Sequence, residues 1–589
     1  MRRLQGFLNK LSKTRLLPLY IFAGVFFFSL IPQLFLPGFS SSDDPYYHVI
    51  HANSYWKNSA MEYPAFSTLS VKPIDLWFLY HILMSPFTAF FDGDNYEALI
   101  LGSKLYHAIL AGILYMVVYF SGKAYAEKLL PARSGRGNTE NAYASPRVIG
   151  FFSVLALIVI PQSFAVRTLI LSRPHVFMII LTMLAMLSIM KKRYFFLFVV
   201  SALAPLSYSF SLLILIPSIG ILAGWFIVSR KRTDLKDSLI PFGVSILGIA
   251  LGVWLHPQSA NYAFNAWVVH GNSVVAALLH NLIPIERFRE YSVPAEFTQT
   301  SGIISVGIAY TVLFAGLAVE LLLSFVSRKK PGALHTGPLE EKAEIIKTSF
   351  VVIGVGFSFL MFFFQRAVEY AAPFLIISGV ALICLRFMPK LLEIHARMSA
   401  RKGEIGDIYR KEVLLVKDIA NEKRFRLFFT FLCVFAFVLS PFLINVSILA
   451  REHHDLYEYQ AAAKYIASQK EKGVVLIPDF GAYPRLIFFG PANRYSSGMD
   501  PRFIYMYSGE VGADIDHFTK NEPICGFADC AGKTLKDGYL TLKEYGVSAV
   551  FSDSSSSRGA KTFEAAEKDP RFKKTFTDPR YPNINIFSL

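Results

Sequence analysis

The chain alternates between long apolar runs and shorter polar segments, which is typical of a protein that crosses a membrane many times. An apolar run of roughly 20 residues is long enough to span a bilayer as a helix. Such runs recur along most of the chain. We predict about eleven crossings, near residues 17–36, 98–121, 148–164, 173–190, 194–228 (two crossings), 238–255, 301–326, 347–364, 371–387 and 427–447.

Basic residues in the polar segments indicate which of them stay in the cytoplasm, because Lys and Arg are enriched in cytoplasmic loops. Segment 1–15 is basic and contains no acidic residue, so the N-terminus is predicted to be cytoplasmic. If the short apolar stretch 75–91 crossed the membrane, the basic loop 122–147 would lie outside. We therefore predict that 75–91 is a helix in the outer interface. It then belongs to one long external loop, 37–97, and a second external loop is predicted at 256–300.

The last part of the chain has a different pattern, and it is long enough for one soluble domain. Residues 453–471 have the periodicity of an amphipathic helix, and 473–478 and 546–551 have the composition of buried strands. The fold class is therefore predicted to be a polytopic α-helical membrane domain, 1–447, followed by an extracytoplasmic α/β domain, 448–589. An odd number of crossings places the two termini on opposite sides.

Composition supports the membrane interpretation, since 53% of the residues are hydrophobic and 17% are charged, against roughly 25% charged in soluble domains. The net charge of +16 would suggest nucleic-acid binding in a soluble protein. Here the basic residues crowd the predicted cytoplasmic loops, so membrane lipids are the expected partners and nucleic acid is not. A bacterial inner (cell) membrane is the expected location, because the chain is compact and shows no eukaryotic targeting signal or cleavable signal peptide.

The four cysteines fall into two pairs of different character. Cys384 and Cys433 lie in apolar runs, where a cysteine packs like a small hydrophobic residue. Cys525 and Cys530 lie close together in the polar C-terminal region. Outside the cell they are able to form a disulfide, and the alternative is two free thiols.

Candidate chemistry begins just after the first predicted crossing, in the segment Ser41-Ser-Asp-Asp-Pro-Tyr-Tyr-His48. Asp43 and Asp44 are adjacent carboxylates at the bilayer surface, where desolvation is costly unless they bind a cation or accept protons. His48 follows on a short helix. This combination suits a general base or a metal ligand, and the alternative is an Asp that caps the helix.

The order of a crossing followed by Asp-Asp-Pro-Tyr-Tyr-His resembles the first external loop of the membrane glycosyltransferases with the GT-C fold. It is most similar to the catalytic subunit of oligosaccharyltransferase. The resemblance implies that Asp44, assisted by Asp43, is catalytic. It also implies transfer of a sugar or oligosaccharide from a polyprenyl phosphate or pyrophosphate donor to a glycan, lipid or protein acceptor in the cell envelope, at the external face.

A second likeness lies in the segment 362–373, where Arg366 stands at the external end of an apolar helix. It resembles an arginine that contacts the donor phosphate in this family, and a guanidinium suits that role because it binds phosphate through two hydrogen bonds. The alternatives are a salt bridge between Arg366 and Glu369 or snorkelling to the surface. Glu369 and Tyr370 are candidates for contact with the acceptor.

Two weaker likenesses concern the acceptor. The segment Pro478-Asp-Phe-Gly-Ala-Tyr-Pro484 resembles the motif that holds the acceptor peptide in oligosaccharyltransferase, although its leading tryptophans are missing here. Asp479 is the matching residue, and the alternative is a turn. In the second predicted external loop, Glu296 resembles a glutamate that engages the acceptor or the metal.

The sequence leaves metal dependence open. In this family the loop between the third and fourth crossings carries acidic residues that complete a metal site, whereas the segment 161–175 contains no carboxylate. One interpretation is a divalent cation, Mg²⁺ or Mn²⁺, bound by Asp44 and His175 together with Asp43, although Mg²⁺ prefers oxygen ligands. The other is a metal-independent enzyme in which Arg173 binds the donor phosphate.

Two functions of other classes remain as alternatives. A flippase or transporter of lipid-linked sugars would need broken segments in the middle of the membrane, for which Pro205 and Pro217 are the candidates. The third interpretation is a noncatalytic protein that keeps the GT-C fold.

Overall fold

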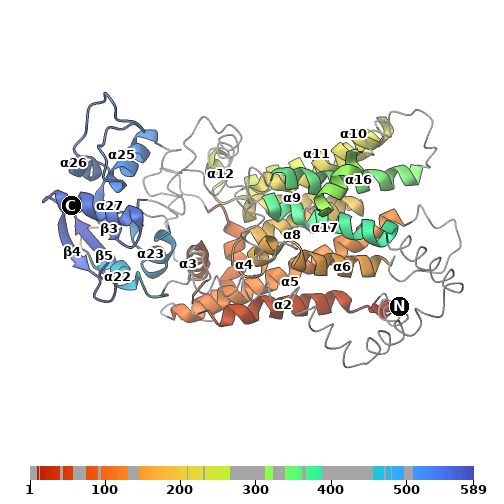
Figure 1. Ribbon diagram of the computed structural model, residues 1–589, viewed down its shortest axis with the longest axis horizontal. Coiled ribbons are helices and arrows are strands. Elements are labelled where there is room, and N and C mark those ends of the chain that lie inside the picture. The colour runs from red at the N-terminus through yellow and green to blue at the C-terminus, as the bar shows by residue number, and fades with distance from the viewer. Residues whose placement is uncertain are drawn as a thin grey trace, which may run out of the picture.

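The protein is described by a computed structural model, in which a bundle of helices is followed by a small domain with a β-sheet (Figure 1). The structure describes residues 10–11, 13–36, 38–39, 44–57, 75–89, 95–130, 145–208, 210–229, 232–265, 312–322, 338–360, 367–387, 455–469, 473–478, 481–496 and 508–589.

The helical region consists of long helices that lie side by side along the molecule, with short helices at their ends (Figure 1). The long helices are α2 (Leu17–Leu34), α5 (Tyr96–Leu129), α6 (Pro146–Val159), α8 (His175–Met190), α9 (Tyr194–Ser207), α10 (Ile216–Val228), α11 (Arg232–Leu255), α16 (Pro338–Leu360) and α17 (Ala367–Leu382). The short ones are α3 (Asp44–Trp56), α4 (Phe78–Ala89), α7 (Gln162–Leu169), α12 (Ser259–Asn265), the 3₁₀ helix η3 (Ser211–Leu215) and the π-helix η6 (Ile383–Phe387).

Six helices in the described part of the chain are long and apolar enough to cross a membrane. They cover Leu17–Leu34, Tyr96–Leu129, Ser211–Val228, Leu235–Leu255, Glu341–Leu360 and Ala367–Leu385. Shorter apolar helices cover Pro146–Val159, His175–Met190, Tyr194–Ser207 and Val312–Leu322. All of them coincide with predicted crossings. The crossing predicted at 427–447 lies outside the described residues, and the count of eleven is not confirmed.

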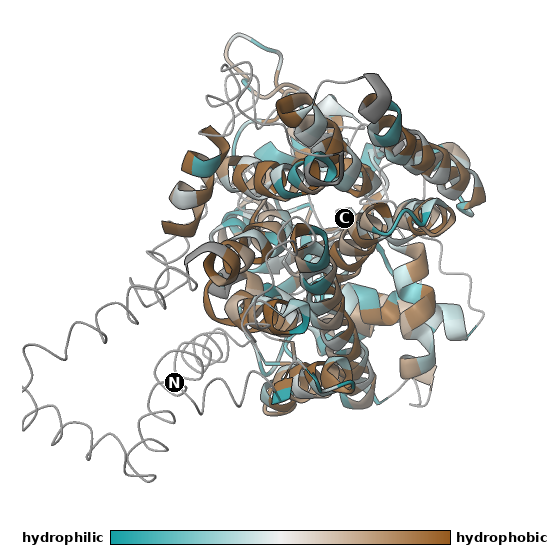
Figure 2. Ribbon diagram, turned by 90° about the vertical axis from the view of Figure 1, so that its right-hand side faces the viewer, coloured by the Kyte–Doolittle hydropathy of each residue, from teal (hydrophilic) through white to brown (hydrophobic). Residues whose placement is uncertain are grey.

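The outer surface of the bundle is apolar, as a surface in contact with lipid must be. On α2, Leu19 and Phe27 are 58% and 55% exposed, and on α11 Trp254 is 74% exposed. Figure 2 shows apolar residues, in brown, along helices of the bundle. Soluble monomers seldom expose such extended apolar surface, so the packing supports an integral membrane protein.

The short stretch predicted to lie in the interface forms α4, which is not among the helices long and apolar enough to cross. Its position relative to a membrane stays a prediction, and so does the sidedness of the termini. Figure 1 shows α3 and α4 at the end of the bundle that faces the C-terminal domain, whereas α2 begins at the opposite end. The segment predicted to be the first external loop therefore contributes helices to the junction between the two parts.

The C-terminal domain is a five-stranded mixed sheet with helices on both faces (Figure 1). The strand order is β2-β1-β3-β5-β4; β1 is parallel to β2 and β3, and β5 is antiparallel to β3 and β4. Its elements are α22 (Gln460–Ser468), β1 (Val474–Leu476), α23 (Tyr483–Phe489), β2 (Arg494–Tyr495), α25 (Gly509–Thr519), α26 (Gly538–Glu544), β3 (Val547–Asp553), α27 (Ser557–Lys568), β4 (Lys573–Thr577) and β5 (Ile584–Ser588).

The two faces of this sheet belong to different cores, because successive side chains of a strand point to opposite faces. Val550 and Phe587 pack with α25, α26 and α27 in a core within the domain. Their neighbours Phe551 and Ile586 face the other way, into a core that runs through α22 and α23 to the helical bundle. The sheet is thereby joined to the membrane region by continuous apolar packing.

The strands predicted around 473–478 and 546–551 are confirmed as β1 and β3. The predicted amphipathic helix at 453–471 is present as the shorter α22. The predicted domain boundary at 447/448 lies outside the described residues and stays a prediction.

Candidate functional site

Asp44 is the first residue of α3, and its carboxylate forms an ion pair with Arg173, which precedes α8. The distance between Asp44 Oδ2 and Arg173 Nη2 is 3.1 Å. The side chains are 29% and 19% exposed, respectively, so both groups remain accessible. The structure therefore brings together the predicted catalytic carboxylate and one of the two predicted phosphate-binding arginines, from segments far apart in the sequence.

This pair lies near the junction of the bundle and the C-terminal domain. Residues that follow Asp44 on α3 pack against α23: the ring centroids of Tyr46 and Phe488 are 5.3 Å apart, and those of Tyr47 and Tyr483 are 6.1 Å apart. Since α3 is held on one side by the bundle and on the other by the domain, the position of Asp44 depends on both parts.

The side chains of His48, His81 and Asp75 form a buried hydrogen-bonded chain. His81 Nδ1 lies 2.7 Å from Asp75 Oδ2, and His81 Nε2 lies 2.8 Å from His48 Nδ1. The ring of His51 stacks on His81 with centroids 5.2 Å apart. All four of these side chains are buried. The predicted site residue His48 thus belongs to a cluster that sequence reasoning missed.

The carboxylate of Asp75 is anchored firmly. It accepts hydrogen bonds from Tyr55 Oη at 2.9 Å and from the Trp77 backbone N–H at 3.0 Å. Burial alone would raise the pKa of Asp75, but the charge and hydrogen bond of His81 outweigh it and lower the pKa to about 2. Asp75 is therefore ionised at neutral pH.

The two neighbouring histidines on α3 are neutral by contrast. Burial lowers the pKa of His51 to about 3. Burial also places the pKa of His48 well below its usual value, aided by the charges of His81, His51, Arg173 and His175. His48 thus lies within electrostatic reach of both the Asp75 cluster and the Asp44–Arg173 pair.

The remaining described candidates are more buried than Asp44. Glu369, on α17, is buried, and its Oε1 lies 3.0 Å from Arg167 Nη1 on α7. Its neighbour Tyr370 is also buried. His175 is buried at the start of α8. The predictions for Asp43, Arg366, Glu296 and Asp479 lie outside the described residues.

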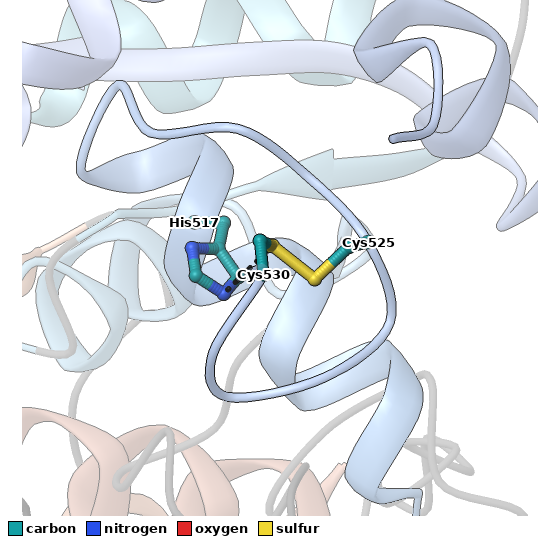
Figure 3. A group of neighbouring side chains, drawn as sticks. All are labelled: His517, Cys525 and Cys530. Carbon is teal, nitrogen blue, oxygen red and sulfur yellow. Dashed lines mark hydrogen bonds between the residues drawn. A yellow bond between two sulfur atoms is a disulfide. The ribbon is translucent and has the colours of Figure 1, made fainter. Parts of the chain in front are cut away.

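The described residues contain two groups whose side chains are close enough to share a metal ion: His51 with Asp75 and His81, and His517 with Cys525 and Cys530. In the second group the two cysteines are joined in a disulfide (Figure 3), so their sulfurs are not available as thiolate ligands. His517 Nε2 instead lies 2.8 Å from the carbonyl oxygen of Phe527. The disulfide and this hydrogen bond therefore stabilise the loop that contains these residues.

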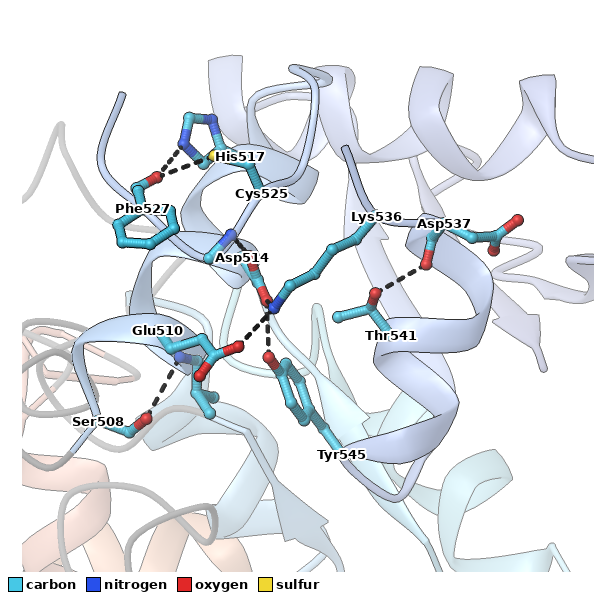
Figure 4. Close-up of polar contacts among 12 residues, drawn as sticks. Ser508, Glu510, Asp514, His517, Cys525, Phe527, Lys536, Asp537, Thr541 and Tyr545 are labelled. Atoms are coloured by element: carbon cyan, nitrogen blue, oxygen red, sulfur yellow. Dashed lines mark hydrogen bonds and ion pairs between the residues drawn. The ribbon is translucent and has the colours of Figure 1, made fainter. Parts of the chain in front are cut away.

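The same loop is held by a polar network around the buried Asp514. Its carboxylate accepts hydrogen bonds from Tyr545 Oη, Lys536 Nζ and the backbone N–H of Gly526 (Figure 4). Lys536 also pairs with Glu510. The charged groups of this described network pair with one another, so the network stabilises the C-terminal domain. The candidate for chemistry is the Asp44–Arg173 pair at α3.

Comparison with known proteins identifies the fold. No family model and no curated protein sequence matches the chain. The crystal structure of the Archaeoglobus fulgidus oligosaccharyltransferase in the apo form is similar, with a TM-score of 0.56 at 12% identity, covering 94% of this chain and 71% of that one. This chain shares the fold of that oligosaccharyltransferase.

Two further structures were found. The archaeal oligosaccharyltransferase AglB from Archaeoglobus fulgidus, in complex with an inhibitory peptide and a dolichol-phosphate, gives a TM-score of 0.52 at 14% identity, covering 96% and 73% of the two chains. The structure of ArnT from Cupriavidus metallidurans, bound to undecaprenyl phosphate, gives a TM-score of 0.49 at 11% identity and covers 97% of both chains. The resemblance to a GT-C glycosyltransferase is thus confirmed at the level of the fold.

Proposed function

We propose that the protein is a membrane glycosyltransferase that moves a sugar or oligosaccharide from a polyprenyl phosphate or pyrophosphate to an acceptor. The observation that carries the proposal is the Asp44–Arg173 ion pair, a carboxylate and a guanidinium at the start of α3 and α8 in a chain with the fold of oligosaccharyltransferase. The AglB structure contains a dolichol-phosphate, and a guanidinium is able to bind a phosphate through two parallel hydrogen bonds.

In the proposed reaction Arg173 binds the phosphate oxygens of the donor, and Asp44 aligns the acceptor and takes its proton. The bond between the sugar C1 and the phosphate oxygen breaks, a bond between C1 and the acceptor forms, and the lipid phosphate leaves. Arg173 stabilises the negative charge that develops on the leaving group. Asp44 is poised to accept the proton because donor binding draws Arg173 toward the phosphate.

The described residues near Asp44 do not fit a hard divalent cation. The described pair provides one carboxylate, already paired with Arg173, whereas Mg²⁺ takes oxygen ligands in near-octahedral geometry; Asp43 lies outside the described residues. The mechanism proposed here therefore uses no step through a metal ion at Asp44, and the transfer is expected to need no added Mg²⁺ or Mn²⁺.

The test is release and transfer of radiolabelled sugar from a polyprenyl donor by the purified chain. Asp44→Asn is expected to abolish transfer without loss of expression. Arg173→Lys is expected to raise KM for the donor, because an ammonium lacks the paired hydrogen bonds of a guanidinium. The matched control is Asp237→Asn, which breaks an exposed ion pair with Lys342 and should leave the rate unchanged.

The outcomes separate the proposed enzyme from its alternatives. Full transfer by Asp44→Asn would rule out the proposed role of this carboxylate. Release that requires added Mg²⁺ or Mn²⁺ would indicate a metal enzyme. Movement of the intact lipid across vesicles without sugar release would indicate a transporter, and neither activity would indicate a noncatalytic protein.

A further inference from the structure

The cluster behind Asp44 contains two imidazoles and a carboxylate from three different places in the chain. His51 lies on α3, Asp75 lies in the turn before α4, and His81 lies on α4. Their candidate ligand atoms all lie within 4.8 Å of one another, and each of the three side chains is 0% exposed. Two histidines and one carboxylate are a ligand set that binds zinc in proteins.

The charge of the cluster calls for a cation. Asp75 is fully buried, and a buried carboxylate is costly unless an opposite charge compensates it. Among the ion pairs of the described residues, its only partner is His81, and no lysine or arginine is paired with it there. A metal ion bound between these side chains would supply the compensating charge.

The surrounding hydrogen bonds match those that support a metal site. A ligating carboxylate is normally held by further hydrogen bonds, and a ligating histidine normally uses its other ring nitrogen to hydrogen-bond a neighbour. Asp75 is held by Tyr55 and Trp77. His81 Nε2 is engaged by His48 at 2.8 Å. This leaves His81 Nδ1 directed at the carboxylate of Asp75, 2.7 Å away.

That separation lies close to the distance between two ligands of one ion. With metal–ligand bonds of about 2.0–2.1 Å in tetrahedral geometry, neighbouring ligand atoms are about 3.3 Å apart. The contact between His81 and Asp75 would have to open by only about 0.6 Å. His51 would supply the third ligand through a ring nitrogen, because its ligand atom lies within 4.8 Å of those of Asp75 and His81.

We propose that His51, Asp75 and His81 bind a zinc-class transition-metal ion that clips α3 to α4. Three protein ligands leave a fourth position for water. Imidazole-rich sets favour Zn²⁺ over Mg²⁺, so this ion differs from one bound by carboxylates at Asp44. One ligand, His51, lies on the same helix as Asp44, so the ion would hold that helix in place, and the proposal does not depend on the transferase activity.

The experiment is metal analysis of the full chain, purified in detergent and dialysed without chelator after exposure to Zn²⁺. Wild-type protein is expected to retain about one zinc ion per chain by mass spectrometry of the metals. His51→Gln and Asp75→Asn should each lower the retained zinc at least several-fold. The control His517→Gln, in the disulfide-linked group, should retain as much as wild type. A monodisperse gel-filtration peak verifies that each variant is folded.

A second measurement uses the wild-type protein and so does not depend on variant folding. X-ray absorption at the zinc edge is expected to show a shell of nitrogen and oxygen with imidazole scattering. Wild-type protein without retained zinc, a sulfur shell, or full retention by folded Asp75→Asn would overturn the proposal. The first of these results would leave the His81–Asp75 contact as a hydrogen bond without a metal ion.

Discussion

Arg167 and Glu369 form a partly buried ion pair between α7 and α17, although they are 202 positions apart in the sequence. The sequence suggested that Glu369 pairs with its neighbour Arg366 or contacts the acceptor. In the structure Glu369 pairs with Arg167, and Arg366 lies outside the described residues. Breaking one side of a buried pair leaves a charge poorly compensated.

Glu369→Gln is therefore expected to destabilise the protein by roughly 3 kcal/mol. The double variant Glu369→Gln with Arg167→Gln should recover part of that loss, because it removes both charges. Thermal unfolding in detergent measures both, with the exposed Glu567→Gln as the matched control. Additive losses in the double variant would show that the two charges are not coupled.

Asp553 at the end of β3 predicts a dependence of stability on pH. Burial would raise its pKa, but hydrogen bonds from Ser555, Asn583 and Tyr459 outweigh it and lower the pKa. A carboxyl with a lowered pKa stabilises the fold above its unfolded pKa of about 3.9, and this contribution is lost as the pH falls.

Asp553→Asn should therefore lower the unfolding temperature at pH 7, and its difference from wild type should shrink as the pH falls below about 4. Thermal scans at several pH values test this, with the exposed Asp529→Asn as control. If the difference in unfolding temperature stays constant with pH, the destabilisation comes from altered packing and not from loss of the negative charge.

At the level of elements, α9 and α11 pack so closely that one contact permits only glycine. A Cβ added at Gly252 would lie 2.1 Å from the carbonyl oxygen of Ala202, whereas one added at Gly243 on the same helix would meet nothing within 4 Å. Small residues allow membrane helices to approach in this way.

Gly252→Ala is expected to destabilise the bundle by about 1–3 kcal/mol, because the helices must move apart. Gly243→Ala should be neutral or slightly stabilising, since alanine is the better helix former. Unfolding in detergent compares the two. Equal stability of both variants would mean that α9 and α11 separate without cost.

For the whole molecule, the central feature is the apolar junction that joins the C-terminal domain to α3. Phe488 on α23 is fully buried there, against Tyr46 on α3 and Tyr96 at the start of α5. The opposite face of the sheet has a matching aromatic residue, Phe563, packed on Phe587.

Phe488→Ala is expected to cost about 3–5 kcal/mol at the junction and to increase hydrogen exchange in α3 and α23 while β3 and β5 stay protected. Phe563→Ala should increase exchange in the sheet and leave α3 unchanged. Hydrogen exchange followed by mass spectrometry distinguishes them. Unchanged exchange at α3 in Phe488→Ala would show that the domain does not hold this helix.

Local patterns along the chain were sufficient for most of the fold. Apolar runs indicated the membrane helices, and β-branched runs after glycine indicated β1 and β3. This works because the burial of a helix or strand is reflected in the spacing of apolar residues in its own sequence. The Asp-Asp-Pro-Tyr-Tyr-His segment likewise pointed to α3 as the place of chemistry and to the fold that the structural comparison confirms.

Only the tertiary structure decided which side chains meet. Asp44 pairs with Arg173, and Glu369 pairs with Arg167. His48, His81 and Asp75 form a cluster. These residues come from segments far apart in the sequence, and no periodic pattern predicts that they meet. Asp75 and His81, polar residues in the short apolar stretch 75–91, are the signal of this cluster in the sequence. Their buried partners became visible only in three dimensions, because hydrogen bonds and ion pairs depend on distance in space and not along the chain.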